Sequence, residues 1–311
     1  MKVLVTGGAG YIGSHICLAL AAAQHEPVVL DNLSTGRREA VQWGPLIQGD
    51  IRSADDLAKA FANGPIHAVI HCAGRLSVAE SLQDPLGYAS VNLDGTQCLI
   101  RAMQAHHTRY CVFSSSAAVY GTPDYMPIAE TTPCQPITPY GETKYAAEQA
   151  LAQSGIHTAS LRYFNACGAD AQQRARWYTL TNLVPILVTA LAQNRPIQVF
   201  GTDYPTPDGT CVRDYIHVSD LADAHLRALT YIINTGQSLT ANLGTGQGTS
   251  VVEIIRTLET VAGQPVPYTT APRRLGDPPC LIADSRYAQQ VLDWHPRRTL
   301  HTMIHDAYQS V

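Results

Sequence analysis

Two side chains that could do acid–base chemistry stand four residues apart in Tyr140-Gly-Glu-Thr-Lys144. On a helix this spacing places them on one face. The ordinary pKa of a tyrosine phenol is about 10, and a nearby ammonium favours the phenolate and lowers that pKa. We therefore predict that Tyr140 acts as a general base toward a substrate hydroxyl, with Lys144 as its partner. The alternative is an ordinary pair on a helix surface.

A glycine-rich turn, Thr6-Gly-Gly-Ala-Gly-Tyr-Ile-Gly13, lies near the start of the sequence. The apolar run from Lys2 to Thr6 predicts a buried strand, and Ser14 to Ala23 predicts a helix. Between a strand and a helix, glycines permit a tight turn, let the backbone approach a pyrophosphate and let the helix pack closely on the sheet. The N-terminus of the helix then faces the anion. The turn predicts a dinucleotide site, and the alternative is a glycine-rich turn without a ligand.

An acidic residue, Asp31, follows the next predicted strand, Val28 to Leu30. It stands about twenty residues after Gly13, where a carboxylate accepts hydrogen bonds from the adenosine ribose and repels a 2′-phosphate. NAD is therefore favoured as the cofactor. Arg37 and Arg38 stand close by and keep NADP as an alternative.

Strand and helix patterns alternate through the first half of the chain, which predicts an α/β fold with a Rossmann-type doubly wound parallel sheet. Ser114-Ser-Ser116 follows one of the strands, and ligands of such sheets gather beyond the carboxyl ends of strands. The predicted strands include 46–48, 68–70 and 110–113, and the predicted helices include 53–62, 91–106 and 140–153.

The pattern changes near Ala166, where the chain becomes rich in Gln, Pro, Thr and Asn. We expect residues 1–165 to form an NAD-binding Rossmann domain, with 211–246 returning to it. Residues 166–210 and 247–311 are expected to form a smaller, discontinuous C-terminal substrate domain.

Composition and charge argue against several classes of protein. The net charge is −4 without a basic run, which argues against nucleic-acid binding. The longest apolar stretch, Ile16 to Ala23, is too short to span a bilayer, and no signal-peptide pattern is visible, so we expect no membrane association and a cytoplasmic protein. The eight cysteines are scattered without a C-x-x-C pair, and we expect reduced thiols and no metal site.

Longer stretches resemble the UDP-glucose 4-epimerases of the extended short-chain dehydrogenase/reductase family. The block from Phe200 to His225 is the most specific to nucleotide-sugar epimerases, whereas the glycine motif marks only the superfamily. The matching stretches are TGGAGYIGSH (6–15), DNLSTG (31–36), GDI (49–51), AESLQDPLGYASVNLDGT (79–96), SSSAAVYG (114–121), PYGETKYAAE (139–148), LRYFN (161–165), FGTDYPTPDGTCVRDYIHVSDLADAH (200–225), NLGTG (242–246) and RRLGD (273–277).

The resemblance implies NAD-dependent interconversion of UDP-glucose and UDP-galactose, catalysed by Ser116, Tyr140 and Lys144. It implies that Tyr140 takes the C4 hydroxyl proton while hydride passes to the nicotinamide, that Ser116 hydrogen-bonds the reacting oxygen and that Lys144 orients the nicotinamide ribose. The 4-keto sugar then rotates while UDP stays anchored, and the hydride returns to the opposite face. The resemblance also implies a homodimer built from helices 91–106 and 140–153, including the apolar residues Leu93, Leu99, Ile100, Met103, Tyr145, Ala146 and Ala150.

Two sets of binding residues follow from the same resemblance. The implied cofactor-binding residues are Gly7, Gly10, Tyr11, Ile12, Gly13, Asp31, Asn32, Gly36, Asp50, Ile51, Cys72, Ala73, Gly74, Asn92, Tyr140, Lys144 and Phe164. The implied UDP-sugar-binding residues are Ser116, Tyr140, Asn165, Asn182, Leu183, Phe200, Arg213, Arg274, Asp277 and Leu281. The two arginines suit a diphosphate because a guanidinium binds phosphate oxygens bidentately.

Leu281 is expected beside the sugar, where its intermediate bulk predicts action on UDP-glucose and UDP-galactose with some activity on the N-acetylated pair. The alternative is that Leu281 packs into the core. The chain departs from the family pattern at Ala166 and Asp170, where Pro and His are common, and in segment 171–181, which carries Arg174, Arg176 and Trp177.

Other functions stay open at this point. A 4-epimerase of UDP-N-acetylglucosamine, UDP-arabinose or UDP-galacturonate needs only a different sugar pocket. A sugar-nucleotide dehydratase is disfavoured because Ala117 and Ala118 stand where such enzymes carry an Asp-Glu pair. A non-catalytic NAD-binding relative is disfavoured because the chain keeps Tyr140 and Lys144.

Overall fold

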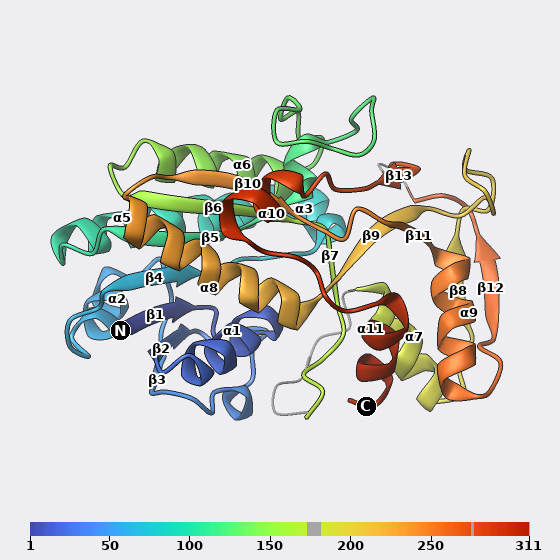
Figure 1. Ribbon diagram of the computed structural model, residues 1–311, viewed down its shortest axis with the longest axis horizontal. Helices are drawn as coiled ribbons and strands as arrows, with labels where there is room; N and C mark the ends of the chain where they lie inside the picture. Colours follow the sequence, from blue (N-terminus) through green and yellow to red (C-terminus); the bar gives the residue numbers. More distant parts are fainter. Residues whose placement is uncertain (173–181, 275–276, 311) are drawn as a thin grey trace.

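The computed structural model describes residues 1–172, 182–274 and 277–310 (Figure 1). Its largest sheet has seven parallel strands in the order β10-β6-β5-β4-β1-β2-β3. This architecture confirms the predicted doubly wound α/β fold. The strands are β1 Lys2–Thr6, β2 Glu26–Asp31, β3 Leu46–Gln48, β4 Ala68–His71, β5 Tyr110–Ser116, β6 His157–Tyr163 and β10 Leu239–Leu243.

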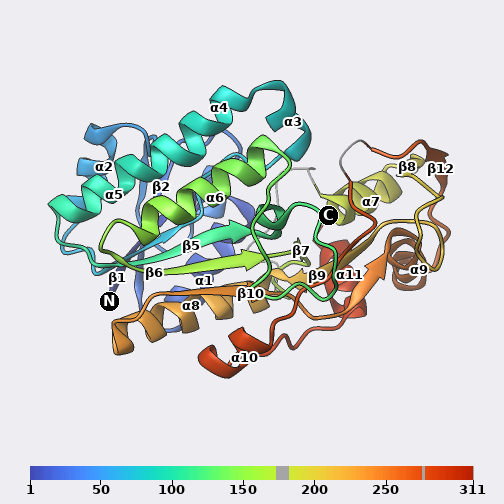
Figure 2. The same ribbon diagram turned by 90° about the horizontal axis from the view of Figure 1, so that it is seen from above.

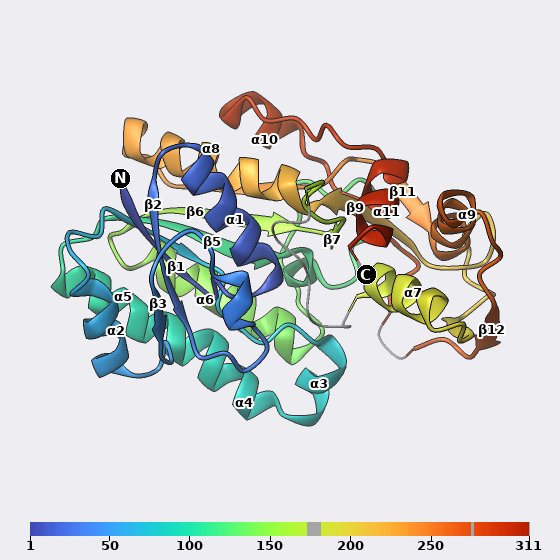
Figure 3. The ribbon, with the colours of Figure 1, turned by 90° about the horizontal axis from the view of Figure 1, so that it is seen from below.

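Helices cover both faces of this sheet, because successive strand side chains point to opposite faces. In β1, Val3 and Val5 pack in the core beneath α1, α8 and α10, whereas Leu4 packs beneath α2, α5 and α6 (Figures 2 and 3). The helices of this part are α1 Tyr11–Ala22, α2 Ala54–Phe61, α3 Val78–Gln83, α4 Pro85–Ala89, α5 Gly95–Ala105, α6 Pro139–Ala152, α8 Val218–Thr235 and α10 Arg286–Leu292, with a π turn at Ser90–Asp94 and 3₁₀ turns at Arg38–Ala40 and Ala117–Tyr120.

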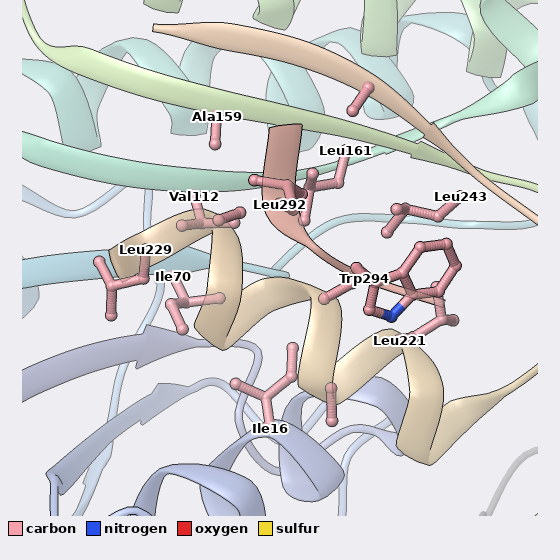
Figure 4. Packing of buried hydrophobic residues seen from close by; sticks show 14 of the residues in the cluster. Ile16, Ile70, Val112, Ala159, Leu161, Leu221, Leu229, Leu243, Leu292 and Trp294 are labelled. Carbon is pink, nitrogen blue, oxygen red and sulfur yellow. The ribbon is translucent and has the colours of Figure 1, made fainter. Parts of the chain in front are cut away.

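Trp294, just after α10, is fully buried against the α8 side of the sheet (Figure 4). Its indole Nε1 donates a hydrogen bond to the Asp220 carbonyl over 3.0 Å, so the polar end of the ring is satisfied. Burial of one such large apolar side chain stabilises the fold by roughly 1.5–3 kcal/mol. The contact holds the C-terminal part of the chain against the Rossmann sheet.

A second group of elements surrounds the strand β9, which pairs with β7 and β13 in parallel and with β11 in antiparallel orientation. A separate two-stranded pair, β8 and β12, lies beside α7, α9 and α11, whose apolar side chains form their own core. The elements are β7 Asn165–Cys167, α7 Leu183–Ala192, β8 Ile197–Phe200, β9 Val212–His217, β11 Gly248–Ser250, α9 Val251–Ala262, β12 Tyr268–Ala271, β13 Cys280–Leu281 and α11 Leu300–Tyr308.

Two elements differ from the domain boundaries expected from the sequence. Strand β9, expected with the Rossmann sheet, belongs to the second group because its neighbours are β7 and β13. Helix α10, expected with the substrate domain, packs on the Rossmann sheet because Ala288 and Leu292 are buried there. Helix α8 and strand β10, from the same 211–246 segment, lie with the Rossmann sheet.

The described residues contain neither a membrane-spanning helix nor a group of metal-binding side chains. None of the helices there combines the length and the apolar character needed to cross a bilayer. In that same part of the chain, no three His, Cys, Asp or Glu side chains are grouped so as to hold a metal ion.

Candidate functional site

The three predicted catalytic residues come together where β5 ends and α6 begins. Ser116 is the last residue of β5, and Tyr140 and Lys144 lie in the first two turns of α6. Helix α6 begins at Pro139 because the Thr138 side chain accepts a hydrogen bond from the Gly141 N–H over 3.2 Å. An added Cβ on Gly141 would lie 2.5 Å from the Ala118 carbonyl oxygen, so glycine lets α6 approach the turn that follows Ser116.

Tyr140 is buried, and its burial raises the pKa of the phenol. Hydrogen bonding to the Ser116 side chain acts in the opposite direction but is the smaller effect. The expectation that the pKa of Tyr140 lies below its ordinary value is wrong for this structure, because the loss of solvation on burial is the largest effect and raises it. The Lys144 ammonium instead donates to the Ser114 carbonyl over 2.9 Å.

Lys144 is itself almost fully buried, and desolvation lowers its pKa to about 8. Cys72 and Glu148 act in the opposite direction. The ammonium lies 5.0 Å from the centre of the Phe113 ring and close to Gly74, where an added Cβ would lie 3.5 Å from Nζ. Lys144 thus lies beneath the segment that follows β4, the strand next to β1 and its glycine turn.

The glycine turn after β1 has the backbone that a pyrophosphate site requires. Gly7 has φ +73°, and a Cβ there would lie 2.6 Å from the Ala73 nitrogen, so this turn lies against the end of β4. A Cβ on Gly13 would lie 2.2 Å from the Gly7 carbonyl oxygen. Gly10 is the N-cap of α1 and makes no side-chain cap hydrogen bond, so the positive end of the helix dipole faces the turn, as an anion site requires.

Asp31 lies at the end of β2 beside this turn. Its carboxylate accepts hydrogen bonds from the Ala9 N–H over 3.0 Å and the Leu33 N–H over 2.8 Å, and burial raises its pKa. A Cβ on Gly36 would lie 2.9 Å from Ala9, so the loop after β2 folds onto the glycine turn. The side chain of Arg38 donates to Gln48 over 2.7 Å, which directs this guanidinium toward β3. This arrangement fits NAD, because the carboxylate can bind the ribose hydroxyls and the helix N-terminus can bind the pyrophosphate.

Other members of the implied cofactor-binding set occupy two environments. Asp50 accepts from Asn32 over 3.1 Å and from Arg52 over 2.7 Å, and the hydrogen bonds from Arg52 lower the pKa of this carboxyl. Ile51 is buried in the core beneath α2 and α5, and Ile12 is half-buried.

Asn92 lies in the π turn before α5 and ties three segments together. Its side chain accepts from the Arg75 N–H over 2.8 Å and donates to the Arg75 carbonyl and to Thr143, each over 3.1 Å. It therefore holds the segment after β4, which includes Gly74, against α6. This network gives Asn92 a positioning role at the site.

The predicted substrate residues form two pairs in the second group of elements. Arg213 donates to Asp277 over 3.1 Å, and the guanidinium of Arg274 lies over the Phe200 ring at 4.0 Å. Asn182 is the N-cap of α7, Leu183 is its first residue and Asn165 begins β7. The predictions on Arg174, Arg176 and Trp177 fall outside the described residues.

Leu281 packs in an apolar cluster that joins the two groups of elements. It is half-buried and contacts the cluster of Ala117, Val119, Tyr120 and Ile128, which Phe164 also joins. In β13 it lies opposite Arg213 of β9. Both readings from the sequence, a residue beside the sugar and a packing residue, fit this half-buried position.

Sequence reasoning missed two residues next to the catalytic set. Tyr88 is fully buried and packs edge-on to Tyr140, with ring centres 6.5 Å apart. Glu148 follows Lys144 by four residues on α6 and is buried. Glu148 continues the four-residue spacing of Tyr140 and Lys144. This spacing is the feature of the sequence that could have placed Glu148 on the same face of the helix.

The fold and the site together define a class of protein. A doubly wound sheet with an uncapped helix after its first strand is built for a dinucleotide. The Ser116, Tyr140 and Lys144 side chains at the adjacent strand ends supply the acid–base groups for redox chemistry on an alcohol.

Comparison with known proteins gives the family. The model of the NAD dependent epimerase/dehydratase family matches residues 3–244. The UDP-glucose 4-epimerase of Rhizobium meliloti (strain 1021) is 46% identical over 314 residues, covering 99% of this chain and 96% of the relative. That of Azospirillum brasilense is 48% identical over 304 residues, covering 95% and 87%.

Solved structures agree with this assignment. The UDP-glucose 4-epimerase from Brucella ovis in complex with NAD has a TM-score of 0.96 and 44% identity, over 99% of this chain and 97% of that chain. The enzyme from Stenotrophomonas maltophila with bound NAD and formylated UDP-arabinopyranose has a TM-score of 0.96 and 42% identity, over 100% and 97%. The chain belongs to the NAD dependent epimerase/dehydratase family, as the resemblance in its sequence predicted, and NAD is its cofactor.

Proposed function

We propose that the chain interconverts UDP-glucose and UDP-galactose by oxidation and re-reduction at C4. The observation that carries this proposal is the convergence of Ser116, Tyr140 and Lys144 beside the glycine turn, with Ala117 and Ala118 in place of the acids of a dehydratase. The relatives named UDP-glucose 4-epimerase, which match nearly the whole chain, support the same activity.

In this reaction Tyr140 takes the proton from the C4 hydroxyl and later returns it. NAD, when bound, supplies the hydride acceptor and a cationic ring that favours the Tyr140 phenolate. Ser116 is placed to hydrogen-bond the reacting oxygen, since its side chain lies close enough to the Tyr140 phenol to oppose the rise in its pKa. The burial of Tyr140 and Lys144 excludes water from the proton-transfer step.

UDP is held by the second group of elements. Arg213 and Arg274 would bind the diphosphate, since guanidinium groups match pairs of phosphate oxygens. Arg213 is oriented by Asp277, and Arg274 lies against Phe200. Anchoring through UDP leaves the 4-keto sugar free to rotate, which the return of hydride to the other face requires.

The sugar preference can be tested with a panel of UDP-sugars, following C4 inversion by NMR without added NAD. We expect UDP-glucose and UDP-galactose to be the principal pair, with some activity on the N-acetylated pair. Leu281→Tyr should reduce the activity on UDP-N-acetylglucosamine far more than that on UDP-glucose, which serves as the internal control. Equal losses would show that Leu281 is not the selector, and preferred inversion of UDP-arabinose or UDP-galacturonate would contradict the proposed substrate.

The proposed assembly is a homodimer across the α5 and α6 side of the molecule. Leu99, Ile100 and Met103 are buried against the sheet, so these three residues of the expected interface cover the sheet within the chain. The exposed apolar side chains on this side instead include Leu82 of α3, 54% exposed, and Leu86 of α4, 82% exposed. Helices α3 and α4 lie beside α6 (Figure 2).

Light scattering at micromolar concentration should give twice the mass of the chain. Leu86→Glu should shift the mass toward the monomer, because it places a charge in an apolar interface. Tyr125→Glu, which changes an exposed side chain on a loop, is the matched control and should leave the mass unchanged. A monomer mass for the unmodified protein would contradict the homodimer.

We infer that the protein works in the cytoplasm, in galactose metabolism. All eight cysteines are free in the structure, which suits a reducing compartment.

A further inference from the structure

A buried ion pair lies directly behind the catalytic residues. Arg162 of β6 donates from Nη2 to Glu148 Oε2 over 2.6 Å and from Nε to Oε1 over 2.9 Å. Their side chains are 7% and 4% exposed. Two charges are held out of water only where further hydrogen bonds satisfy them.

Those further hydrogen bonds reach the elements of the site. The Ser115 hydroxyl, next to Ser116 at the end of β5, donates to Glu148. Arg162 Nη1 donates to the Tyr120 hydroxyl over 3.0 Å, and that hydroxyl donates to Asn242 of β10 over 2.7 Å. The pair therefore ties α6 to β5, to β6, to the 3₁₀ turn after Ser116 and to β10.

We propose that Glu148 and Arg162 act as a positioning pair for the reaction, holding Tyr140 and Lys144 on α6 in register with Ser116 on β5. Glu148 follows Lys144 by one helical turn, as Lys144 follows Tyr140, so all three lie on one face of α6. A displacement of about 1 Å at reacting groups costs on the order of 100-fold in rate. Ser115, which donates to Glu148, lies one residue before Ser116, and Arg162 lies two residues before Phe164, which follows β6.

Glu148 also places a negative charge near the Lys144 ammonium. The titratable groups that face Lys144 are His71 at the end of β4, Cys72 directly after it and Glu148 of α6. Burial lowers the pKa of His71 to about 3, so this imidazole is neutral, and it raises the pKa of the Cys72 thiol, so this thiol is protonated. Glu148, which is paired with Arg162, is therefore the anion among these groups, and it favours the ammonium form of Lys144.

The sign of the pH effect follows from this arrangement. Desolvation has already lowered the pKa of Lys144 to about 8, and the Glu148 carboxylate opposes that shift. Removing the carboxylate lowers the pKa of Lys144 further. The ammonium is then lost at a lower pH, and the alkaline limb of the kcat profile moves to lower pH with it.

The test is a direct titration of Lys144 in the NAD-containing protein. The chain has only three lysines, Lys2, Lys59 and Lys144, so ¹⁵N-lysine labelling gives three side-chain signals, and Lys144→Met assigns the buried one. Glu148→Gln should lower the pKa of Lys144 and reduce kcat by about tenfold or more. The signals of Lys2 and Lys59 are internal controls and should not move.

Two further variants keep the test decisive. Glu148→Gln combined with Arg162→Met removes both buried charges, so it should fold even where the single variant does not, and its Lys144 pKa should fall by less. Asp223→Asn breaks the surface pair with Arg227 on α8 and should change neither kcat nor the Lys144 pKa. An unchanged Lys144 pKa in the folded Glu148 variants, or an unchanged kcat, would overturn the proposal. The kinetic measurement rests on the proposed epimerase function, whereas the titration does not, so the two failures are distinguishable.

Discussion

Replacing Tyr140 with phenylalanine is expected to reduce kcat by about 10²–10⁴-fold, the loss typical of a removed general acid–base group. The substitution removes only the phenol oxygen, which is the atom that carries the transferred proton in the proposed reaction. The ring that packs edge-on to Tyr88 remains, so the fold of the site is kept. Binding of UDP-glucose, measured by calorimetry, should change little because the residues proposed to bind UDP lie elsewhere.

The matched control for this variant is Tyr88→Phe. Tyr88 is the neighbouring buried tyrosine, and its hydroxyl donates to Glu80 over 3.3 Å. We expect nearly normal turnover from it. Nearly normal turnover from Tyr140→Phe would instead remove Tyr140 from the mechanism.

Replacing Gly13 with alanine is expected to remove most of the bound NAD. The purified protein should carry NAD that is released only on denaturation, because each catalytic cycle regenerates it. A Cβ at Gly13 would lie 2.2 Å from the Gly7 carbonyl oxygen, so the glycine turn or α1 must shift. NAD content, measured by chromatography of the denatured protein, should fall about tenfold or more, equivalent to about 1.4 kcal/mol of binding free energy.

Gly263→Ala separates this effect from a general loss of stability. Gly263 caps α9 with φ +67° and has open space around its Cα, so alanine there strains the backbone far from the glycine turn. That variant should melt at a lower temperature yet keep its NAD. Full NAD content in Gly13→Ala would contradict the role given to the glycine turn.

Much of the cofactor half could be predicted because its signals are local. The strands Lys2–Thr6 and Leu46–Gln48 were predicted at their observed bounds. The first helix begins at Tyr11 rather than Ser14, because the last residues of the glycine motif already form its first turn. The helix expected over 91–106 is a π turn at Ser90–Asp94 followed by α5 at Gly95–Ala105.

The electrostatics of the site could not be predicted from residue spacing. The separation of Tyr140 and Lys144 correctly places them on one face, but the pKa of Tyr140 depends on burial, which tertiary packing decides. The pairing of Arg213 with Asp277 joins residues far apart in the chain. Neither residue type nor periodicity specifies such a contact.

The expected dimer interface shows the same limit. Leu99 and Met103 look like an apolar helix face that could serve either a partner or the sheet. The structure buries them against the sheet and leaves Leu82 and Leu86 exposed on the preceding short helices. The helical period identifies an apolar face, whereas the fold decides what covers it.

The most direct measurement of the central claim follows the C4 hydrogen itself. UDP-galactose carrying deuterium at C4 is incubated with the purified protein in ordinary water, without added NAD, and the product is examined by NMR. The account predicts UDP-glucose with deuterium retained at C4, because the same hydride leaves and returns within one bound cycle. Product with hydrogen from water at C4, or no C4 inversion at all, would contradict it.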